Sequence, residues 1–131
     1  MLFSDKELNF DIPKVMGIIN LTPDSFSDGG RFFSKKSLEI DRSKVLKEIE
    51  AMEKSGASFI DIGAESTRPN SVRISVQEEM DRLMPILEEI KNIRAVVSID
   101  SSKGEVIFEA IKKGVNLIND CLLYTSPSPR D

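Results

Sequence analysis

Residues 15–20 read VMGIIN, a short apolar run that ends on a polar side chain, Asn20. Three other runs along the chain have the same character: SFIDIG at 58–63, AVVSID at 95–100 and VNLIN at 115–119. Short runs rich in Ile and Val are typical of strands that are buried on both faces, as they are in parallel sheets. The four runs therefore predict four strands of one sheet.

Segments with helical periodicity separate these runs. In each segment apolar residues recur at intervals of three or four, so that they fall on one face of a helix. These residues are Val45, Leu46, Ile49 and Met52 in the first segment, Val76, Met80, Leu83, Leu87 and Ile90 in the second, and Val106, Ile107, Ala110 and Ile111 in the third. Strands and helices thus alternate along the chain.

Short motifs predict where the helices begin and end. Ser75–Glu78 and Ser102–Glu105 have the capping-box pattern, in which each of two side chains satisfies an N–H of the first turn. Gly56 and Gly114 are expected to end the first and third helices. Pro85 is expected to kink the second helix or to shift its boundary, because proline lacks the N–H that a helix interior uses.

The alternation predicts an α/β fold with a parallel sheet and right-handed crossovers. A doubly wound sheet and a TIM barrel both fit, but no G-x-G-x-x-G motif follows the first run, which argues against a dinucleotide site. We assign residues 14–120 to this domain and residues 1–13 to an N-terminal extension or hairpin. Residues 121–131 read CLLYTSPSPRD, and Ser-Pro-Ser-Pro excludes regular structure. This tail is either a naturally disordered terminus or, as we expect, foreign sequence after a truncated domain.

The composition is that of an ordinary globular domain, and it limits which partners and metal ligands the protein can have. The chain has 131 residues, 40% of them hydrophobic and 31% charged, with a net charge of −4 and no apolar run of membrane-spanning length. It has no basic stripe, so we expect neither a nucleic-acid nor a membrane partner. A single cysteine, Cys121, excludes an internal disulfide framework and predicts a cytoplasmic protein. Histidine is absent, so a metal would be held by oxygen atoms, which favours magnesium.

Polar side chains stand at or near the end of each predicted strand. They are Asn20 at the first, Asp61 and residues 65–68 at the second, Asp100 at the third and Asn119 at the fourth. The carboxyl ends of parallel strands share one rim, where α/β enzymes place their active sites. Such residues also cap helices, and Asp61 has a second interpretation as a structural residue bonded to the backbone or to Arg68. Because polar residues from four separate segments meet at one rim, we favour a functional site over a set of helix caps.

The sequences MGIINLTPDSFSDGG at 16–30 and DIGAESTRPN at 61–70 resemble the two signature loops of the dihydropteroate synthase family. SIDSSK at 98–103 and LIND at 117–120 match the same family in order and spacing. The resemblance covers about residues 14–120 and implies a (β/α)8 TIM barrel, of which this chain is roughly the first half. Pterin-binding relatives among the corrinoid methyltransferases share the barrel but not the first loop as it is written here.

The resemblance also implies an activity. The family joins 6-hydroxymethyl-7,8-dihydropterin diphosphate to 4-aminobenzoate in folate biosynthesis, forming 7,8-dihydropteroate and releasing diphosphate. Little acid–base catalysis is needed, because the pterin ring can donate electrons into the breaking C–O bond. The protein must bind the ring, stabilise the leaving anion and hold the amine in line. A homodimer is implied for the full-length protein.

Roles for individual residues follow from the same resemblance. Asn20 is expected to ligate Mg²⁺ through its amide oxygen, beside the diphosphate. Thr67 and Arg68 are expected to meet the diphosphate or to steady the second loop, with Arg68 as a catalytic residue. Asp100 and Asn119 are expected to contact the pterin ring. A carboxylate can accept two N–H bonds from an aminopyrimidine edge, and an amide can donate and accept at once.

In the first loop, the resemblance implies that Phe26 and Asp28 close over the site. Asp28 is expected to act as a catalytic residue by stabilising positive charge that develops on the methylene group. Phe26 and Pro69 are expected to wall the aminobenzoate pocket. The alternative for Asp28, with Gly29 and Gly30, is a simple turn.

Three hypotheses therefore compete. The chain is the N-terminal half of a dihydropteroate synthase, or a non-catalytic pterin-binding module such as the pterin-binding domain of a methyltransferase, or a fragment with no function of its own. The family's remaining lysine and Arg-x-His motif belong to a second half that is absent from this sequence. A half barrel leaves its first and last strands unpaired. We therefore expect the 131-residue chain to be inactive alone and to be poorly soluble or self-associating.

Overall fold

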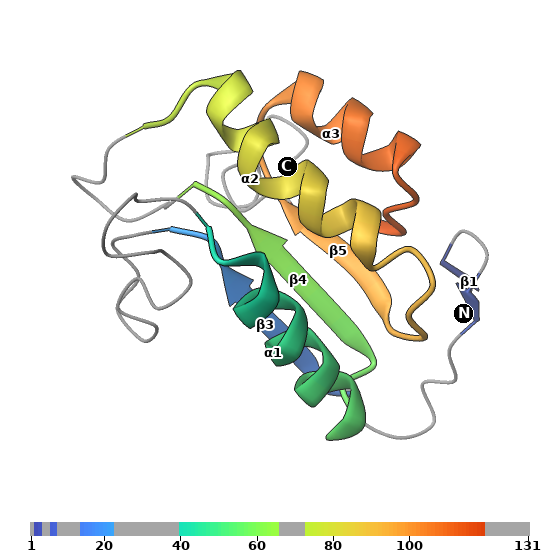
Figure 1. Cartoon of the computed structure of the whole chain (residues 1–131). Helices are drawn as coiled ribbons and strands as arrows, with labels where there is room; N and C mark the ends of the chain where they lie inside the picture. The colour runs from blue at the N-terminus through green and yellow to red at the C-terminus, as the bar shows by residue number, and fades with distance from the viewer. Residues whose placement is uncertain (1, 4–5, 8–13, 23–39, 66–72, 120–131) are drawn as a thin grey trace.

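The computed structural model describes residues 2–3, 6–7, 14–22, 40–65 and 73–119 (Figure 1). Within these residues, four parallel strands form one sheet in chain order. They are β3 (Met16–Asn20), β4 (Phe59–Gly63), β5 (Val96–Asp100) and β6 (Leu117–Asn119). Each begins one or two residues later than its apolar run predicts. A separate antiparallel pair joins β1 (Leu2–Phe3) to β2 (Lys6–Glu7).

Three helices lie between successive strands of the four-stranded sheet, and all of them cover the same face of it (Figure 1). They are α1 (Arg42–Lys54), α2 (Val76–Glu89) and α3 (Gly104–Lys112). The predicted alternation of strand and helix is therefore confirmed. Among the residues that the structure describes, none of the helices has the length and apolar character to cross a bilayer.

The hydrophobic core lies between the sheet and the helices. Its buried members include Ile19, Ile60, Ile62, Val97 and Ile99 on the strands, and Val45, Ile49, Leu83, Ile86 and Val106 on the helices. Burial of one such side chain stabilises the fold by about 1.5–3 kcal/mol. Because side chains alternate along a strand, the residues between these core positions point to the opposite face of the sheet. That opposite face carries the polar residues that follow.

The predicted helix ends are partly confirmed. Gly56 and Gly114 follow α1 and α3 with φ angles of 101° and 95°, a conformation that favours glycine. The Ser75 hydroxyl caps α2 by accepting a hydrogen bond of 3.1 Å from the N–H of Glu78. The Glu78 carboxylate pairs with Arg82 one turn along the helix, at 2.7 Å.

One prediction about the helices is wrong, and one of the two alternatives for Pro85 is excluded. Ser102–Glu105 is not a capping box, because α3 begins at Gly104 and its N-cap, Lys103, makes no side-chain capping bond. The side chain of Lys103 instead reaches two glutamates of other segments, and its N–H donates to Ser101 Oγ at 3.2 Å. The boundary of α2 does not shift at Pro85, since the helix continues to Glu89, and a kink at Pro85 stays a prediction. Buried residues on both sides of Pro85 pack that helix against the core and offset the one hydrogen bond that proline removes.

Candidate functional site

Three of the predicted site residues lie in one row at the carboxyl end of the sheet. Asn20 pairs in register with Gly63, Gly63 with Asp100, and Asp100 with Asn119. Residues paired in this way point to the same face of a parallel sheet. We call these four residues the strand-end row. Its three side chains are half-buried and belong to three different strands.

Gly63 leaves a gap in the strand-end row. Neighbouring strands lie about 4.8 Å apart, so the backbones of Asn20 and Asp100 are roughly 10 Å apart with no side chain between them. A Cβ atom at position 63 would lie 3.3 Å from Cβ of Asp100 and 3.7 Å from its Oδ2. Glycine therefore keeps the space beside the carboxylate open.

A second polar layer lies one step below the row, on the same face. Asp61 and Ser98 are paired in register and buried, with exposed fractions of 5% and 0%. The Ser98 hydroxyl donates to Asp61 Oδ1 at 2.6 Å, and the Asn119 amide nitrogen donates to Asp61 Oδ2 at 3.4 Å. Asp61 thus orients the amide of Asn119, because the nitrogen side of that amide is held toward the carboxylate.

This layer was only partly predictable. The structural interpretation of Asp61 names the backbone or Arg68 as its partner, whereas the structure places Ser98 and Asn119 against it. Arg68 lies outside the described residues. Ser98 was missed, although a signal exists. It stands two residues before Asp100, as Asp61 stands two residues before Gly63, and a spacing of two puts strand residues on one face.

The ends of β3 and β4 are held together by Arg82 of α2. Its Nη1 donates to the carbonyl oxygen of Ala64 at 2.9 Å and to that of Leu21 at 3.3 Å. These carbonyls belong to the residues directly after Gly63 and Asn20. The N–H of Leu21 also donates to the carbonyl of Gly63, at 2.7 Å. Arg82 therefore fixes the point at which both connections leave the sheet.

A buried ion cluster joins the segments that follow β4 and β5. Lys103 Nζ lies 2.8 Å from Glu79 Oε1 and 3.0 Å from Glu65 Oε2. Glu65 Oε2 also accepts a hydrogen bond of 2.9 Å from the N–H of Ile74, which closes the base of the connection between them. Glu79 is 1% exposed, and its second oxygen has no hydrogen-bond partner within the described part of the chain.

Glu65 and Lys103 stabilise each other's charged forms. Burial by itself raises the pKa of the Glu65 carboxyl, but the Ile74 N–H and Lys103 outweigh it and hold the pKa below its usual value. Burial by itself lowers the pKa of Lys103, but hydrogen bonds to Glu79 and Glu65 raise that pKa above its usual value. Both groups therefore carry their charges at neutral pH.

The other predicted site residues lie outside the described residues. They are Phe26, Asp28, Thr67, Arg68 and Pro69. Their roles stay predictions. The tail at 121–131 also lies outside the described residues.

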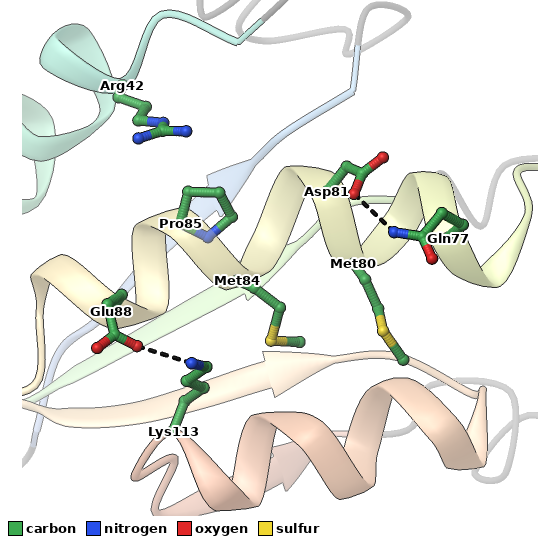
Figure 2. Close-up of a pocket in the computed structure, with 8 residues that line it drawn as sticks. All are labelled: Arg42, Gln77, Met80, Asp81, Met84, Pro85, Glu88 and Lys113. Atoms are coloured by element: carbon green, nitrogen blue, oxygen red, sulfur yellow. Dashed lines mark hydrogen bonds and ion pairs between the residues drawn. The ribbon is translucent and has the colours of Figure 1, made fainter.

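A surface pocket of about 620 Å³ lies on the helical side of the domain (Figure 2). Its lining consists of Arg42, Gln77, Met80, Asp81, Met84, Pro85, Glu88 and Lys113. None of these residues belongs to the strand-end row or to the layer below it. Figure 2 shows that most of them come from α2, on the side of the sheet where the helices lie. We therefore place the candidate site at the strand-end row and not in this pocket.

A parallel sheet with helices on one face and a row of amide and carboxylate groups at its carboxyl end defines a ligand-binding domain of the β/α-barrel class. The chain belongs to the pterin binding enzyme family, whose model matches residues 16–129.

Individual relatives agree with this membership. The dihydropteroate synthase of Haemophilus influenzae is 44% identical over 126 residues, which are 95% of this chain and 43% of that protein. The crystal structure of Yersinia pestis dihydropteroate synthase with a sulfonamide drug matches with a TM-score of 0.84 and 39% identity, over 97% of this chain and 44% of that one. The structure of the Burkholderia cenocepacia enzyme with 7,8-dihydropteroate matches with a TM-score of 0.72 and 35% identity, over 92% of this chain and 37% of that one.

These comparisons confirm the resemblance to dihydropteroate synthase and the half-barrel fold. The chain spans less than half the length of each of these relatives. Its four parallel strands in chain order correspond to the first half of the (β/α)8 barrel.

Proposed function

We propose that this chain is the N-terminal part of a dihydropteroate synthase, which condenses 6-hydroxymethyl-7,8-dihydropterin diphosphate with 4-aminobenzoate. The observation that carries the proposal is the strand-end row. Asn20, Asp100 and Asn119 come from three segments that match the family's motifs, and the register places them side by side on one face. The Burkholderia cenocepacia relative was solved with 7,8-dihydropteroate, which supports a pterin product for this chain as well.

The proposed pterin contacts are Asp100 and Asn119. The Asp100 carboxylate would accept N–H bonds from the aminopyrimidine edge, and such charge-assisted bonds are about twice as strong as neutral ones. The bond from Asn119 to Asp61 fixes which side of the Asn119 amide faces the ligand. Gly63 leaves room beside Asp100 for a flat ring.

Magnesium is proposed as the ion that accompanies the diphosphate. Among the residues that the structure describes, no group of three or more acidic, histidine or cysteine side chains could hold a metal ion by itself. A single neutral amide oxygen, that of Asn20, fits an ion whose other ligands are substrate phosphates and water, which is the usual manner of Mg²⁺. When bound, the ion would offset the negative charge of the leaving diphosphate.

The remaining roles rest on the sequence motifs. Thr67 and Arg68 are proposed to grip the diphosphate, Asp28 to stabilise positive charge at the methylene, and Phe26 and Pro69 to contact the aminobenzoate. For Thr67, Arg68 and Pro69, support comes from the anchoring of the described residues on either side of residues 66–72, since Glu65 is bonded to both Ile74 and Lys103.

Equilibrium binding of 6-hydroxymethyl-7,8-dihydropterin diphosphate to the longest product of the gene tests the proposal. Asp100→Asn keeps the shape of the side chain and removes its charge, so calorimetry should show binding weakened by about 1–3 kcal/mol, or roughly five- to 150-fold. Asp81→Asn, an exposed change on α2, is the matched control and should bind like the wild type. Unchanged affinity in Asp100→Asn would contradict the assignment of that residue.

Product formation then separates a synthase from a non-catalytic pterin-binding module. Mass spectrometry should detect 7,8-dihydropteroate when both substrates are supplied. A product that binds the pterin diphosphate but forms no 7,8-dihydropteroate would instead be a binding module.

A further inference from the structure

We infer that Arg82 and Lys103 are positioning residues, which set the geometry of the strand-end row without touching the substrate. The inference rests on the proposed function and adds two residues that the sequence motifs do not assign to the site. Arg82 and Glu79 lie three positions apart on α2 and therefore share one face of that helix. Through these two side chains, a single helix reaches the segments that follow β3, β4 and β5.

Arg82 makes two hydrogen bonds to backbone carbonyls in addition to its ion pair with Glu78. Its guanidinium is 14% exposed and donates to the carbonyls of Leu21 and Ala64. Each carbonyl belongs to the first residue beyond a strand, where ladder partners end. Hydrogen bonds from a charged donor are strong, and removal of the donor leaves two buried carbonyls without it. Loss of Arg82 should therefore let the ends of β3 and β4 move relative to each other.

The contacts of Lys103 join the end of β5 to the end of β4. Lys103 stands three residues after Asp100, and Glu65 stands two residues after Gly63. Glu65 and Glu79 have side-chain exposures of 10% and 1%, and both are bonded to the one ammonium group. Removal of one partner from such a buried cluster leaves uncompensated charge, which is far more costly than loss of a surface ion pair. Two buried carboxylates without Lys103 would repel each other and move apart.

Loss of Arg82 or Lys103 should change the distance between Asn20 and Asp100. These two side chains flank the gap at Gly63. In the proposed function Asp100 contacts the pterin ring, and Asn20 would hold the ion beside the diphosphate of the same substrate. A displacement of about 1 Å between groups that must engage one ligand can cost a hundredfold in rate. Because side chains of α2 are bonded to the segments that follow β3, β4 and β5, the helix sets the distance between Asn20 and Asp100 without belonging to the strand-end row.

Steady-state kinetics of the longest gene product with Lys103→Met tests the inference. Methionine keeps most of the side-chain length and removes the charge. The KM for the pterin diphosphate should rise about tenfold or more, and the KM for 4-aminobenzoate should change much less, because the row holds the pterin. Lys113→Met is the matched control. It removes another lysine–glutamate pair, 2.9 Å from Glu88 on the far end of α2, and should leave both KM values within about twofold.

A merely structural role predicts a different result. Partial unfolding would lower the apparent kcat and leave both KM values unchanged, and that outcome overturns the inference. Lys103→Arg keeps the charge and should restore most of the affinity for the pterin diphosphate. If Lys103→Met does not fold, Arg82→Lys and Glu65→Gln are measured in the same way, and an unchanged pterin KM in both overturns the inference. A wild-type protein that binds no pterin diphosphate refutes the proposed function instead, so the two failures are distinct.

Discussion

Gly63→Ala adds one methyl group to the strand-end row, beside Asp100. The new Cβ would lie 3.3 Å from Cβ of Asp100, 3.6 Å from its carbonyl oxygen and 3.7 Å from Oδ2. Favourable carbon–carbon contact begins at about 3.5 Å, so Asp100 must retreat by a few tenths of an ångström. Crowding of this kind costs about 1–3 kcal/mol in stability, and the lower entropy of the unfolded alanine chain offsets about 0.4–1 kcal/mol of it. The net destabilisation should be about 0.5–2 kcal/mol.

The effect on the site should exceed the effect on the fold. A methyl group occupies the space beside the carboxylate and displaces the proposed pterin contact, whose loss costs about 1.5–3 kcal/mol. Calorimetry with the pterin diphosphate should therefore show affinity reduced about tenfold or more. Gly104→Ala is the matched control, because its Cβ would meet nothing within 4 Å and it lies at the start of α3. It should bind like the wild type. Wild-type affinity in Gly63→Ala, with the protein folded, would refute the reasoning.

Two further predictions concern the buried polar groups. Ser98→Ala removes the hydroxyl that donates to Asp61 at 2.6 Å, and urea denaturation should show the free energy of unfolding lowered by about 1–3 kcal/mol. Ser43→Ala, on the exposed side of α1, is the control and should change the free energy of unfolding by less than about 0.5 kcal/mol. Equal effects of the two substitutions would contradict a stabilising role for the Ser98–Asp61 hydrogen bond. Because the folded protein holds the pKa of Glu65 below its usual value of 4.5, the stability from this group is present above that pH and lost as the pH falls through the lower, folded-state pKa. Glu65→Gln should therefore show a shallower loss of stability below about pH 4.5 than the wild type, and an identical acid limb would refute this.

The sheet was predictable because each strand carries its own signal. The apolar runs locate the four strands without knowledge of their neighbours, and their order predicts the half barrel. The apolar runs at Val15, Ser58 and Ala95 each begin one residue before the strand that the structure shows. The last strand begins at Leu117 and not at Val115. Just before it, the side-chain oxygen of Asn116 accepts a hydrogen bond from the N–H of Val97 at 3.1 Å, and the N–H of Asn116 donates to the Val97 carbonyl at 2.9 Å.

The rim of the sheet was predictable, whereas the layer beneath it was predictable only in part and the contacts of Lys103 behind it were not. Asn20, Asp100 and Asn119 end their strands, so strand position alone places them together. The partners of Asp61 and Lys103 lie far away in the sequence, 37 residues for Ser98 and 24 for Glu79. No local pattern specifies such pairs. The ion pairs of Lys103 with Glu79 and Glu65 also explain why the capping box predicted at Ser102–Glu105 does not form, because Lys103 takes the N-cap position of α3.

The order of the strands in the sheet has a consequence for biosynthesis. Each strand after β3 pairs with the strand of the sheet that is translated just before it. Contacts between successive units favour rapid ordering, and N-terminal parts of a chain generally fold first. The nascent polypeptide can therefore place Asn20, then the gap at Gly63, then Asp100, then Asn119, in the order of translation. A synonymous-codon pause after β6 should be tolerated better than one between β4 and β5, which would leave the site half assembled on the ribosome.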